Sequence, residues 1–441
     1  MIVIVTLDTF GVKMAGPAIR VWEMASRLSA EHKVRVLSFG DVQLEATGFE
    51  LVATSVKDFK TDLGNPDIII LQGNLVASFP MLVQMDAKLV VDLYDPFHIE
   101  SLEEGKYDPL PEREHSLQVA LRELEMQLRA GDYFLCASER QRRLWLGHLA
   151  ALGRINPRTY DADPTLRNLI DLAPFGIAPQ PQQTHHGALE MFQLDAADPL
   201  IVWGGGIYNW FDPVTTIRAV HLVKEKIPNV RLVFMGAKHP NPSVPKMRAD
   251  TAARAEVAKL HLEENVFFNE DWVDYADRHN FLMDADVAVS AHLPGIETEF
   301  SFRTRMLDYL WAGLPIVCSD GDFFADLVRD RKLGRVVPAQ DEKALAVAFY
   351  DLLSSATERE ACQERIAQVA EEFRWGNTLQ ALVNYCRDPW FAVDREESRQ
   401  VAVASLPKRS AFTLVRRGLR GLREQGFDAT MQRVRRWAQM R

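Results

Sequence analysis

The sequence predicts an α/β protein made of two tandem doubly wound domains. Short, almost continuously apolar runs alternate with helical patterns in both halves of the chain, as expected when parallel strands are buried on both faces. A polar, proline-containing segment, Pro179–Gly187, separates the two series. The length of 441 residues is also too great for one compact core and suits two domains.

In the first half, the pattern predicts five buried strands separated by helices. The expected strands are Ile2–Thr6, Val34–Ser38, Ile68–Leu71, Leu89–Leu93 and Tyr133–Ala137. Helical spacing of apolar residues marks Ala18–Ser29 and Leu117–Ala130. Strand–helix alternation of this kind implies a parallel sheet with helices on both faces.

The second half repeats this organisation after the polar segment. Its expected strands are Leu200–Trp203, Arg231–Met235, Val266–Phe268, Val287–Ser290 and Ile316–Cys318. Helices are expected at Pro213–Lys224 and Arg303–Trp311. Ligands of such sheets bind beyond the carboxyl ends of the strands, so two facing domains predict one central cleft.

These patterns divide the chain into five segments. The expected boundaries are 1–178 for the first Rossmann-like domain, 179–197 for a linker, 198–375 for the second Rossmann-like domain, 376–400 for a C-terminal helix able to cross back to the first domain, and 401–441 for a basic helical tail. In the tail, ten basic residues accompany two acidic ones, and apolar residues follow helical spacing.

Composition narrows the functional class. The net charge of −10 argues against nucleic acid as a partner. The four cysteines are scattered and lack the spacing of a metal site, which argues against disulfides and a cysteine-bound metal and favours a reducing compartment. Apolar runs fall short of the roughly 18 residues that span a bilayer, and the first residues read as a strand rather than a signal peptide, so a cytoplasmic location is expected.

In each half of the chain, a glycine-containing loop follows the first strand. Gly11 and Gly16 precede a helix in the first, and Gly204–Gly206 follow a strand in the second. Glycines let backbone N–H groups approach an anion, and a helix N-terminus favours negative charge. The alternative for the first loop is a turn that only starts a helix, with Pro17 at the first helical position. The alternative for the second loop is a glycine turn whose neighbouring tryptophans pack in the core. The Gly11–Gly16 loop matches neither a P-loop nor a G-x-G-x-x-G pattern.

Polar residues also follow the fourth strand, where a cleft is expected. His98 is suited to donate a hydrogen bond to a sugar hydroxyl or a leaving phosphate, and Asp95 is suited to hold a hydroxyl. The alternative is that Asp95 and Pro96 form a turn that caps the next helix. Lys238, just past a strand of the second half, adds a charge to the same site or is a solvated surface lysine.

The most informative segment is Glu297–Val317. Ser301 is expected to cap a helix that carries Arg303, Arg305 and Asp308 and ends at a Gly-Leu-Pro turn. Carboxylates bind vicinal hydroxyls, and arginines and a helix N-terminus bind phosphates, so the segment suits a sugar diphosphate. The alternative is an ordinary surface helix with its charges in solvent.

At this segment the sequence resembles the family-four glycosyltransferases. Glu299 and Asp308 bracket a stretch that closes with Trp311-Ala-Gly-Leu-Pro-Ile-Val317, as the paired acidic residues and A-x-G-x-P-V of that family do. Further landmarks occur in the family's order: the Gly11–Gly16 loop, Cys136-Ala-Ser-Glu139, Ala173-Pro-Phe-Gly-Ile177, the Gly204–Gly206 loop, Asp284-Ala-Asp286 and Leu333-Gly-Arg-Val-Val-Pro338. The resemblance covers roughly residues 1–390.

The resemblance implies two Rossmann-like domains (the GT-B fold) and transfer of a sugar from a nucleotide-sugar donor to a glycan or lipid-linked saccharide, usually with retention. The expected catalytic residues are His98, Glu299 and Asp95. The expected donor-binding residues are Gly16, Gly205, Gly206, Lys238, Ser301, Phe302, Arg303, Arg305 and Asp308. Arginine, lysine and helix N–H groups would stabilise the leaving phosphates, so no metal or cofactor is expected.

Departures from the family pattern leave other readings open. Asp308 replaces the usual glutamate at a longer spacing, so that Glu297 can change the pairing, and the usual Arg and Lys pair is absent in its common form. A catalytically silent module that binds a nucleotide sugar or a partner subunit is one alternative, and a nucleotide-sugar epimerase is another. The basic tail, 401–441, suits either an anionic membrane surface or packing on a protein.

Overall fold

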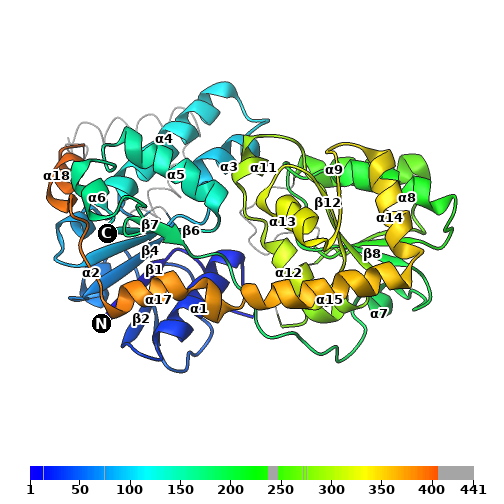
Figure 1. The fold of residues 1–441 in the computed structure, drawn as a ribbon, viewed down its shortest axis with the longest axis horizontal. Helices are drawn as coiled ribbons and strands as arrows, with labels where there is room; N and C mark the ends of the chain where they lie inside the picture. Colours follow the sequence, from blue (N-terminus) through cyan, green and yellow to red (C-terminus); the bar gives the residue numbers. More distant parts are fainter. Residues whose placement is uncertain (13, 74, 237–246, 272, 275, 406–441) are drawn as a thin grey trace, which may run out of the picture.

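The computed structural model contains two parallel sheets, each covered by helices on both faces (Figure 1). It describes residues 1–405 except 13, 74, 237–246, 272 and 275. The predicted fold class is confirmed: the chain folds as two Rossmann-like domains side by side, followed by helices that return to the first domain.

The first sheet has the strand order β3-β2-β1-β4-β5-β6-β7, with every pair parallel. The strands are β1 (Ile2–Thr6), β2 (Val34–Ser38), β3 (Glu50–Ala53), β4 (Ile68–Gln72), β5 (Lys88–Asp92), β6 (Tyr133–Cys136) and β7 (Ile170–Leu172). The helices are α1 (Gly16–Leu28), α2 (Phe59–Leu63), the 3-10 helix η1 (Pro80–Gln84), α3 (Phe97–Glu104), α4 (Leu110–Ala130), α5 (Glu139–Ala151) and α6 (Pro157–Ala162). The strand order reverses between β1 and β4, the position at which such sheets bind ligands.

The second sheet has the order β10-β9-β8-β11-β12-β13 and is also parallel throughout. The strands are β8 (Leu200–Trp203), β9 (Arg231–Phe234), β10 (Val266–Phe268), β11 (Val287–Ser290), β12 (Ile316–Ser319) and β13 (Gly334–Val337). The helices are α8 (Pro213–Lys224), α9 (Arg248–Leu260), α10 (Arg278–Met283), α11 (Ile296–Phe300), α12 (Thr304–Ala312), α13 (Phe323–Arg331) and α14 (Glu342–Leu353). The short helix α7 (Ala188–Phe192) lies in the connection between the sheets.

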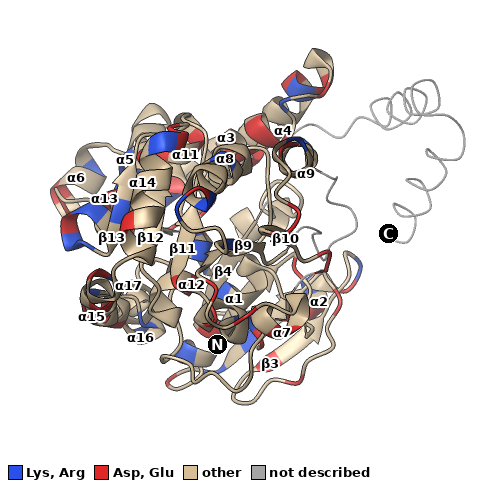
Figure 2. Cartoon of the chain, turned by 90° about the vertical axis from the view of Figure 1, so that its right-hand side faces the viewer, with Lys and Arg blue, Asp and Glu red and all other residues tan. Residues whose placement is uncertain are grey.

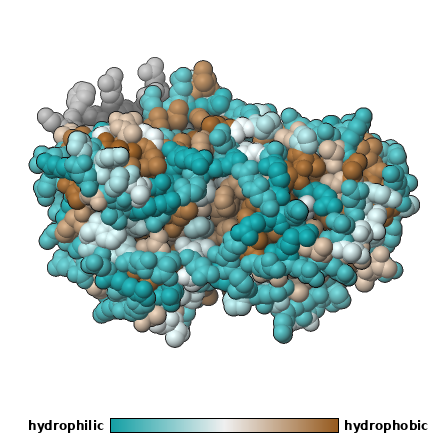
Figure 3. All heavy atoms as spheres, in the orientation of Figure 1, coloured by the Kyte–Doolittle hydropathy of each residue, from teal (hydrophilic) through white to brown (hydrophobic). Residues whose placement is uncertain are grey.

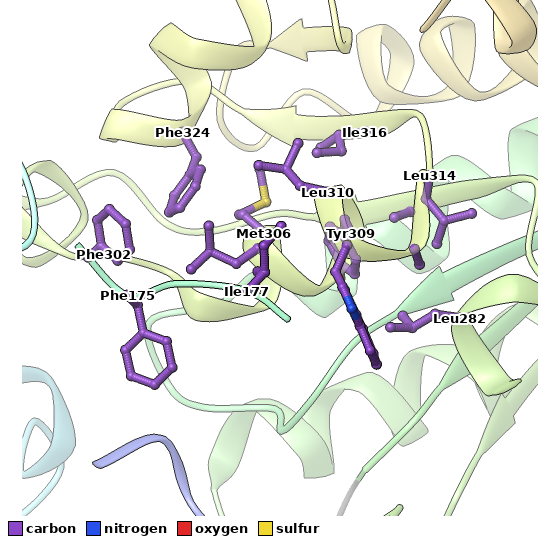
Figure 4. Close-up of a cluster of buried hydrophobic side chains, with 14 of the residues drawn as sticks. Phe175, Ile177, Leu282, Phe302, Met306, Tyr309, Leu310, Leu314, Ile316 and Phe324 are labelled. Atoms are coloured by element: carbon purple, nitrogen blue, oxygen red, sulfur yellow. The ribbon is translucent and has the colours of Figure 1, made fainter. Parts of the chain in front are cut away.

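The chain crosses between the domains twice at one place. The main-chain N–H of Ile177, after β7, donates to the carbonyl of Phe373, which follows the long helix α15 (Ala356–Glu372). A Cβ on Gly176 would lie 2.5 Å from the ring of Trp375, so only glycine fits this crossing. Figure 4 shows Phe175 and Ile177 beside the apolar side of α12, so the crossing segment packs on the helix that carries the predicted donor site.

After this crossing, the chain returns to the first domain through three helices. These are α16 (Trp375–Thr378), α17 (Gln380–Arg387) and α18 (Arg395–Ser405). Tyr385 of α17 stacks on Tyr133 of β6 at 4.4 Å, and Arg387 forms a bidentate ion pair with Glu31. Asp394, ahead of α18, binds the buried guanidinium of Arg154 at 2.9 and 3.0 Å. The C-terminal helices are therefore part of the first domain's packing.

In the view of Figure 2, lysine and arginine residues are interspersed with aspartate and glutamate residues. In the part of the chain that the structure describes, no helix combines the length and apolar character needed to cross a membrane. The basic tail lies outside the described residues from 406 onwards.

Candidate functional site

The candidate site is a cavity of about 470 Å³ between the two domains. This volume lies in the range typical of small-molecule sites. The first domain contributes the N-terminus of α1, the segment after β5 and the segment after β7; the second contributes the glycine loop after β8 and the segment from α11 to α12. Figure 3 shows apolar residues gathered in the gap between the two halves. The carboxyl ends of both sheets therefore meet at one cleft, as the sequence predicts.

Most of the predicted donor-binding residues line this cavity. They are Gly16, Gly205, Gly206, Ser301, Phe302, Arg303, Arg305 and Asp308, and the predicted catalytic Asp95 lines it as well. Lys238 lies outside the described residues. Gly205 has a φ of +73°, a conformation that favours glycine, so the loop after β8 bends tightly towards the cavity.

Arg305 is the buried cation of the second domain's wall. Its Nη2 donates to the carbonyl of Gly206 at 2.7 Å, and its guanidinium lies 3.8 Å from the ring centre of Phe211. Its Nη1 is buried and has no hydrogen-bond partner among the described residues. Burial lowers the pKa of Arg305 to about 10, so it remains charged at neutral pH. A desolvated guanidinium with an unused donor beside a glycine loop suits a phosphate oxygen.

Arg303 is held by two buried carboxylates. Its Nη2 donates to Glu297 at 2.8 Å, and its Nε lies 3.6 Å from Asp322, at the start of α13. Asp322 also lies 3.5 Å from His292, which follows β11. These contacts fix the positions of both Arg303 and Glu297 on the cavity wall, because each charge has a partner in a desolvated setting.

The structure corrects the placement of Ser301 and Glu299. Ser301 does not cap the helix that carries the arginines: it ends the separate short helix α11, and α12 begins at Thr304. Glu299 is exposed and is not among the residues that line the cavity, whereas Glu297 is 6% exposed and lines it. Two residues along a helix are about 200° apart, so the two carboxylates point in opposite directions.

The structure also corrects the placement of His98. Its side chain is 6% exposed and packs against Trp145 and His148 of α5, with ring centres 5.6 and 5.1 Å away, instead of lining the cavity. Burial, and then the neighbouring His148, lower the pKa of His98 to about 4. His98 is therefore neutral at physiological pH and belongs to an aromatic cluster behind the cleft.

Several lining residues were not predicted from the sequence, and four of them bear on the chemistry. Glu100 lies in the first turn of α3, just after Asp95 in the chain, and Tyr94 and Phe175 supply aromatic surface in the first domain. Arg278 binds Asp308 at 3.0 Å and lies over the ring of Trp311, at 4.2 Å from its centre. A signal for Glu100 exists, since it shares the polar run after β5 with Asp95. Arg278 carries no local signal, because α10 approaches Asp308 only through the fold.

Fold and cleft together define a protein of the GT-B class, with two Rossmann-like domains and a ligand cavity between them. Residues 198–355 match the family described as Glycosyl transferases group 1. The match lies within the second domain and covers less than half of the chain, so this domain resembles that family, and the whole chain shares its fold with solved glycosyltransferases.

Curated sequence relatives match over a limited stretch. The chain is 33% identical over 103 residues to a phosphatidyl-myo-inositol mannosyltransferase of Mycobacterium leprae and 29% identical over 103 residues to that of Mycolicibacterium smegmatis. These matches cover 23% of this chain and 26% of each relative, so the chain spans about a quarter of the length of the curated relatives it matches.

Solved structures match over most of the chain at low identity, which establishes the fold. WaaG, a glycosyltransferase involved in lipopolysaccharide biosynthesis, has a TM-score of 0.58 at 14% identity over 93% of this chain and 100% of its own. Anabaena HepE in complex with UDP-glucose has a TM-score of 0.63 at 14% identity, and an E. coli trehalose-6-phosphate protein bound with UDP-2-fluoro glucose has 0.64 at 13%; each covers 88% of this chain and 99% of its own.

Proposed function

We propose that this protein transfers a sugar from a nucleotide-sugar donor to a hydroxyl-bearing acceptor, with the donor diphosphate bound by Arg305 and the Gly204–Gly206 loop. The observation that carries the proposal is the buried Arg305, whose Nη1 has no hydrogen-bond partner in the described part of the cavity. The likeness of the fold to proteins bound with UDP-glucose and UDP-2-fluoro glucose supports this kind of donor.

The proposed chemistry follows from the charge on the cavity wall. As the bond from the sugar to the phosphate breaks, negative charge grows on the leaving phosphate, and a fixed guanidinium stabilises that charge in a desolvated site. The N-terminus of α12, which begins one residue before Arg305, adds a partial positive charge. With this stabilisation supplied by the chain, we propose that the reaction is metal-independent, and the family resemblance favours retention at the anomeric carbon.

The test uses Arg305→Gln with Arg331→Gln as the matched control. Arg331 is half-exposed, pairs with Glu372 and is not among the residues that line the cavity. UDP-, GDP- and ADP-sugars are screened by thermal stabilisation, and release of nucleoside diphosphate is then measured with and without EDTA. We expect Arg305→Gln to weaken binding of the stabilising nucleotide at least tenfold and Arg331→Gln to leave it unchanged. Equal binding by both variants would refute the assignment of Arg305, and the absence of any nucleotide effect would refute the function.

A nucleotide-sugar-binding module without catalysis is the second candidate. The exposed position of Glu299 and the position of His98 outside the cavity lining favour it, because two of the three predicted catalytic residues do not face the cleft. If the protein is such a module, a nucleotide sugar should stabilise it against heat. Hydrolysis and transfer by the wild type should then be no faster than by the Arg305→Gln variant.

A separate proposal concerns the basic tail and the surface on which the acceptor lies. We propose that residues 401–441, with ten basic and two acidic residues, bring the protein to an anionic membrane that carries a lipid-linked acceptor. Co-sedimentation with vesicles of phosphatidylcholine alone, or with added phosphatidylglycerol, tests the full chain against a chain ending at Ser405. Unchanged binding to anionic vesicles after truncation would overturn it, and binding of a protein instead of lipid is the competing outcome.

A further inference from the structure

Asp95 and Glu100 form a carboxyl pair on the first-domain wall of the cavity. Asp95 follows β5, and Glu100 lies in the first turn of α3, so the intervening turn folds one side chain back on the other. Their side chains are hydrogen-bonded to each other, and both line the cavity. Two ionised carboxylates cannot donate to one another, so a hydrogen bond between them requires a proton on one of the two.

The surroundings of the pair favour that proton. The charge of Asp95 and then burial raise the pKa of Glu100 well above 4.5. Burial, with Glu297 and Asp92 as further neighbours, raises the pKa of Asp95 to about 6, although the hydrogen bond from Glu100 opposes this rise. The proton therefore resides on Glu100, which donates to Asp95. Glu104, on the next turn of α3, adds a further negative neighbour.

The neighbouring carboxylates already have basic partners. Asp92 receives two hydrogen bonds from the buried Arg20 at 2.7 and 2.8 Å, and Glu297 receives one from Arg303. The ring of Tyr94, from the first domain, and the ring of Tyr208, from the second, also line the cavity, and burial raises the pKa of Tyr208 to about 12, so that it stays neutral. The part of the cavity beside the pair is thus acidic and aromatic, with Glu297 and Tyr208 contributed by the second domain, and the arginines Arg303 and Arg305 line the second-domain wall.

This distribution of charge should favour neutral acceptors over anionic ones. A sugar or cyclitol hydroxyl donates readily to the carboxylate of Asp95, and its ring packs against the aromatic side chains. A phosphate or carboxylate on the same ring next to the reacting hydroxyl would meet Asp95 and Glu297, and like charges in a desolvated site are strongly unfavourable.

We propose that the Asp95–Glu100 pair is the subsite for the reacting hydroxyl of an uncharged polyol ring, with Glu100 as the positioning residue that holds Asp95 through their shared proton. The inference rests on the proposed function, since it assigns the acceptor half of the same cleft. Deprotonation of Glu100 places two negative charges side by side, so acceptor binding should weaken as the pH rises through the upper pKa of the pair.

The first test measures the proton directly and needs no activity. Carboxyl-13C-labelled protein is titrated by NMR as wild type, Asp95→Asn, Glu100→Gln and the control Glu103→Gln, which alters a partly exposed residue paired with Lys106. We expect the raised titration of Glu100 to move towards 4.5 in Asp95→Asn and to vanish in Glu100→Gln, and to be unchanged in the control. A Glu100 that titrates near 4.5 in the wild type would overturn the shared proton.

The second test measures acceptor class by ligand-observed NMR on protein saturated with the nucleotide that stabilises it. The probes are myo-inositol and myo-inositol 1-phosphate, and methyl glucoside and glucose 6-phosphate. We expect each neutral ring to bind at least tenfold more tightly than its phosphorylated partner. Glu100→Gln, which keeps a donor for Asp95, should retain this binding, and Glu100→Ala should lose it at least tenfold.

The outcomes separate this inference from the function on which it rests. Tighter binding of the phosphorylated rings, or binding of neither kind to the nucleotide-loaded protein, would overturn the acceptor subsite while leaving donor binding intact. A protein that fails to bind any nucleotide but retains the coupled titration would instead refute the proposed function, and with it the assignment of the pair to an acceptor.

Discussion

The side-chain amide of Gln141, in the first domain, donates to the main-chain carbonyl of Phe300, in the second, at 2.9 Å. The same nitrogen donates to the carbonyl of Tyr94 at 2.8 Å, and the side-chain oxygen accepts from the N–H of Ala137. Gln141 has no exposed surface. One buried amide thus joins α5, the cavity segment after β5 and the end of α11, and so links the two walls of the cleft.

Replacing Gln141 should loosen the domains without unfolding either. We expect Gln141→Leu to weaken nucleotide-sugar affinity about tenfold, since the lost interdomain bond leaves buried carbonyls unpaired. Gln127→Leu is the control, because Gln127 is equally buried and donates to Gly73 within the first domain. Small-angle scattering of both variants reports the separation of the domains. An unchanged radius of gyration and affinity in Gln141→Leu would show that this amide does not set the cleft.

Glu297 and Glu299 should differ sharply on substitution. Glu297→Gln removes the charge that pairs with buried Arg303, so we expect a loss of about 3 kcal/mol in stability and at least a hundredfold loss of turnover. Glu299→Gln alters an exposed carboxylate and should change both by little. Thermal melts and nucleotide release measure the two effects. A large loss of turnover in Glu299→Gln alone would restore the prediction made from the sequence.

The glycine loop after β8 should tolerate no side chain at Gly204. A Cβ there would lie 2.9 Å from the ring of Tyr309, whose hydroxyl accepts from the Gly204 N–H and donates to the carbonyl of Val289. We expect Gly204→Ala to displace Tyr309 and weaken nucleotide binding at least tenfold. Gly147→Ala is the control, since a Cβ in that part of α5 meets nothing within 4 Å and should stabilise the helix by about 0.5–1 kcal/mol.

Strands that are buried on both faces are the part of the fold that the sequence predicts well. β1, β2, β8 and β11 have the predicted bounds because their residues form apolar runs. The three missed strands, β3, β7 and β13, are edge strands with half-exposed residues, which leave no continuous apolar signal. The first turns of α4 were missed for a similar reason, since Leu110 and its neighbours extend into solvent.

The site was predicted at the level of segments but not of side-chain direction. The loops and arginines at the carboxyl ends of the strands line the cavity as expected. The helix was expected to run on from Ser301, whereas the chain is extended at Ser301 and starts a new helix at Thr304. Because of this break, the residues of α11 point in other directions than they would in one continuous helix, and Glu297 faces the cavity in place of Glu299. Contacts such as Arg278 with Asp308 depend on the folded chain and have no local pattern.

His98 should act on stability and its pH dependence more than on turnover. Its pKa is about 4 in the folded protein and about 6.5 when unfolded, so only the unfolded chain takes up a proton between these values. The stability attributable to a neutral His98 is therefore present above about pH 6.5 and is lost as the pH falls towards 4, by about 2 kcal/mol at pH 5.

His98→Phe removes this titration and keeps an aromatic ring beside Trp145. We expect melting curves to show the variant gaining stability relative to the wild type between pH 7.5 and pH 5, with His115→Phe, an exposed control, showing no such gain. Nucleotide release at pH 7.5 should change less than threefold in His98→Phe, because the ring lies behind the cavity wall; a loss of a hundredfold with an unchanged melting temperature would instead return His98 to the catalytic site.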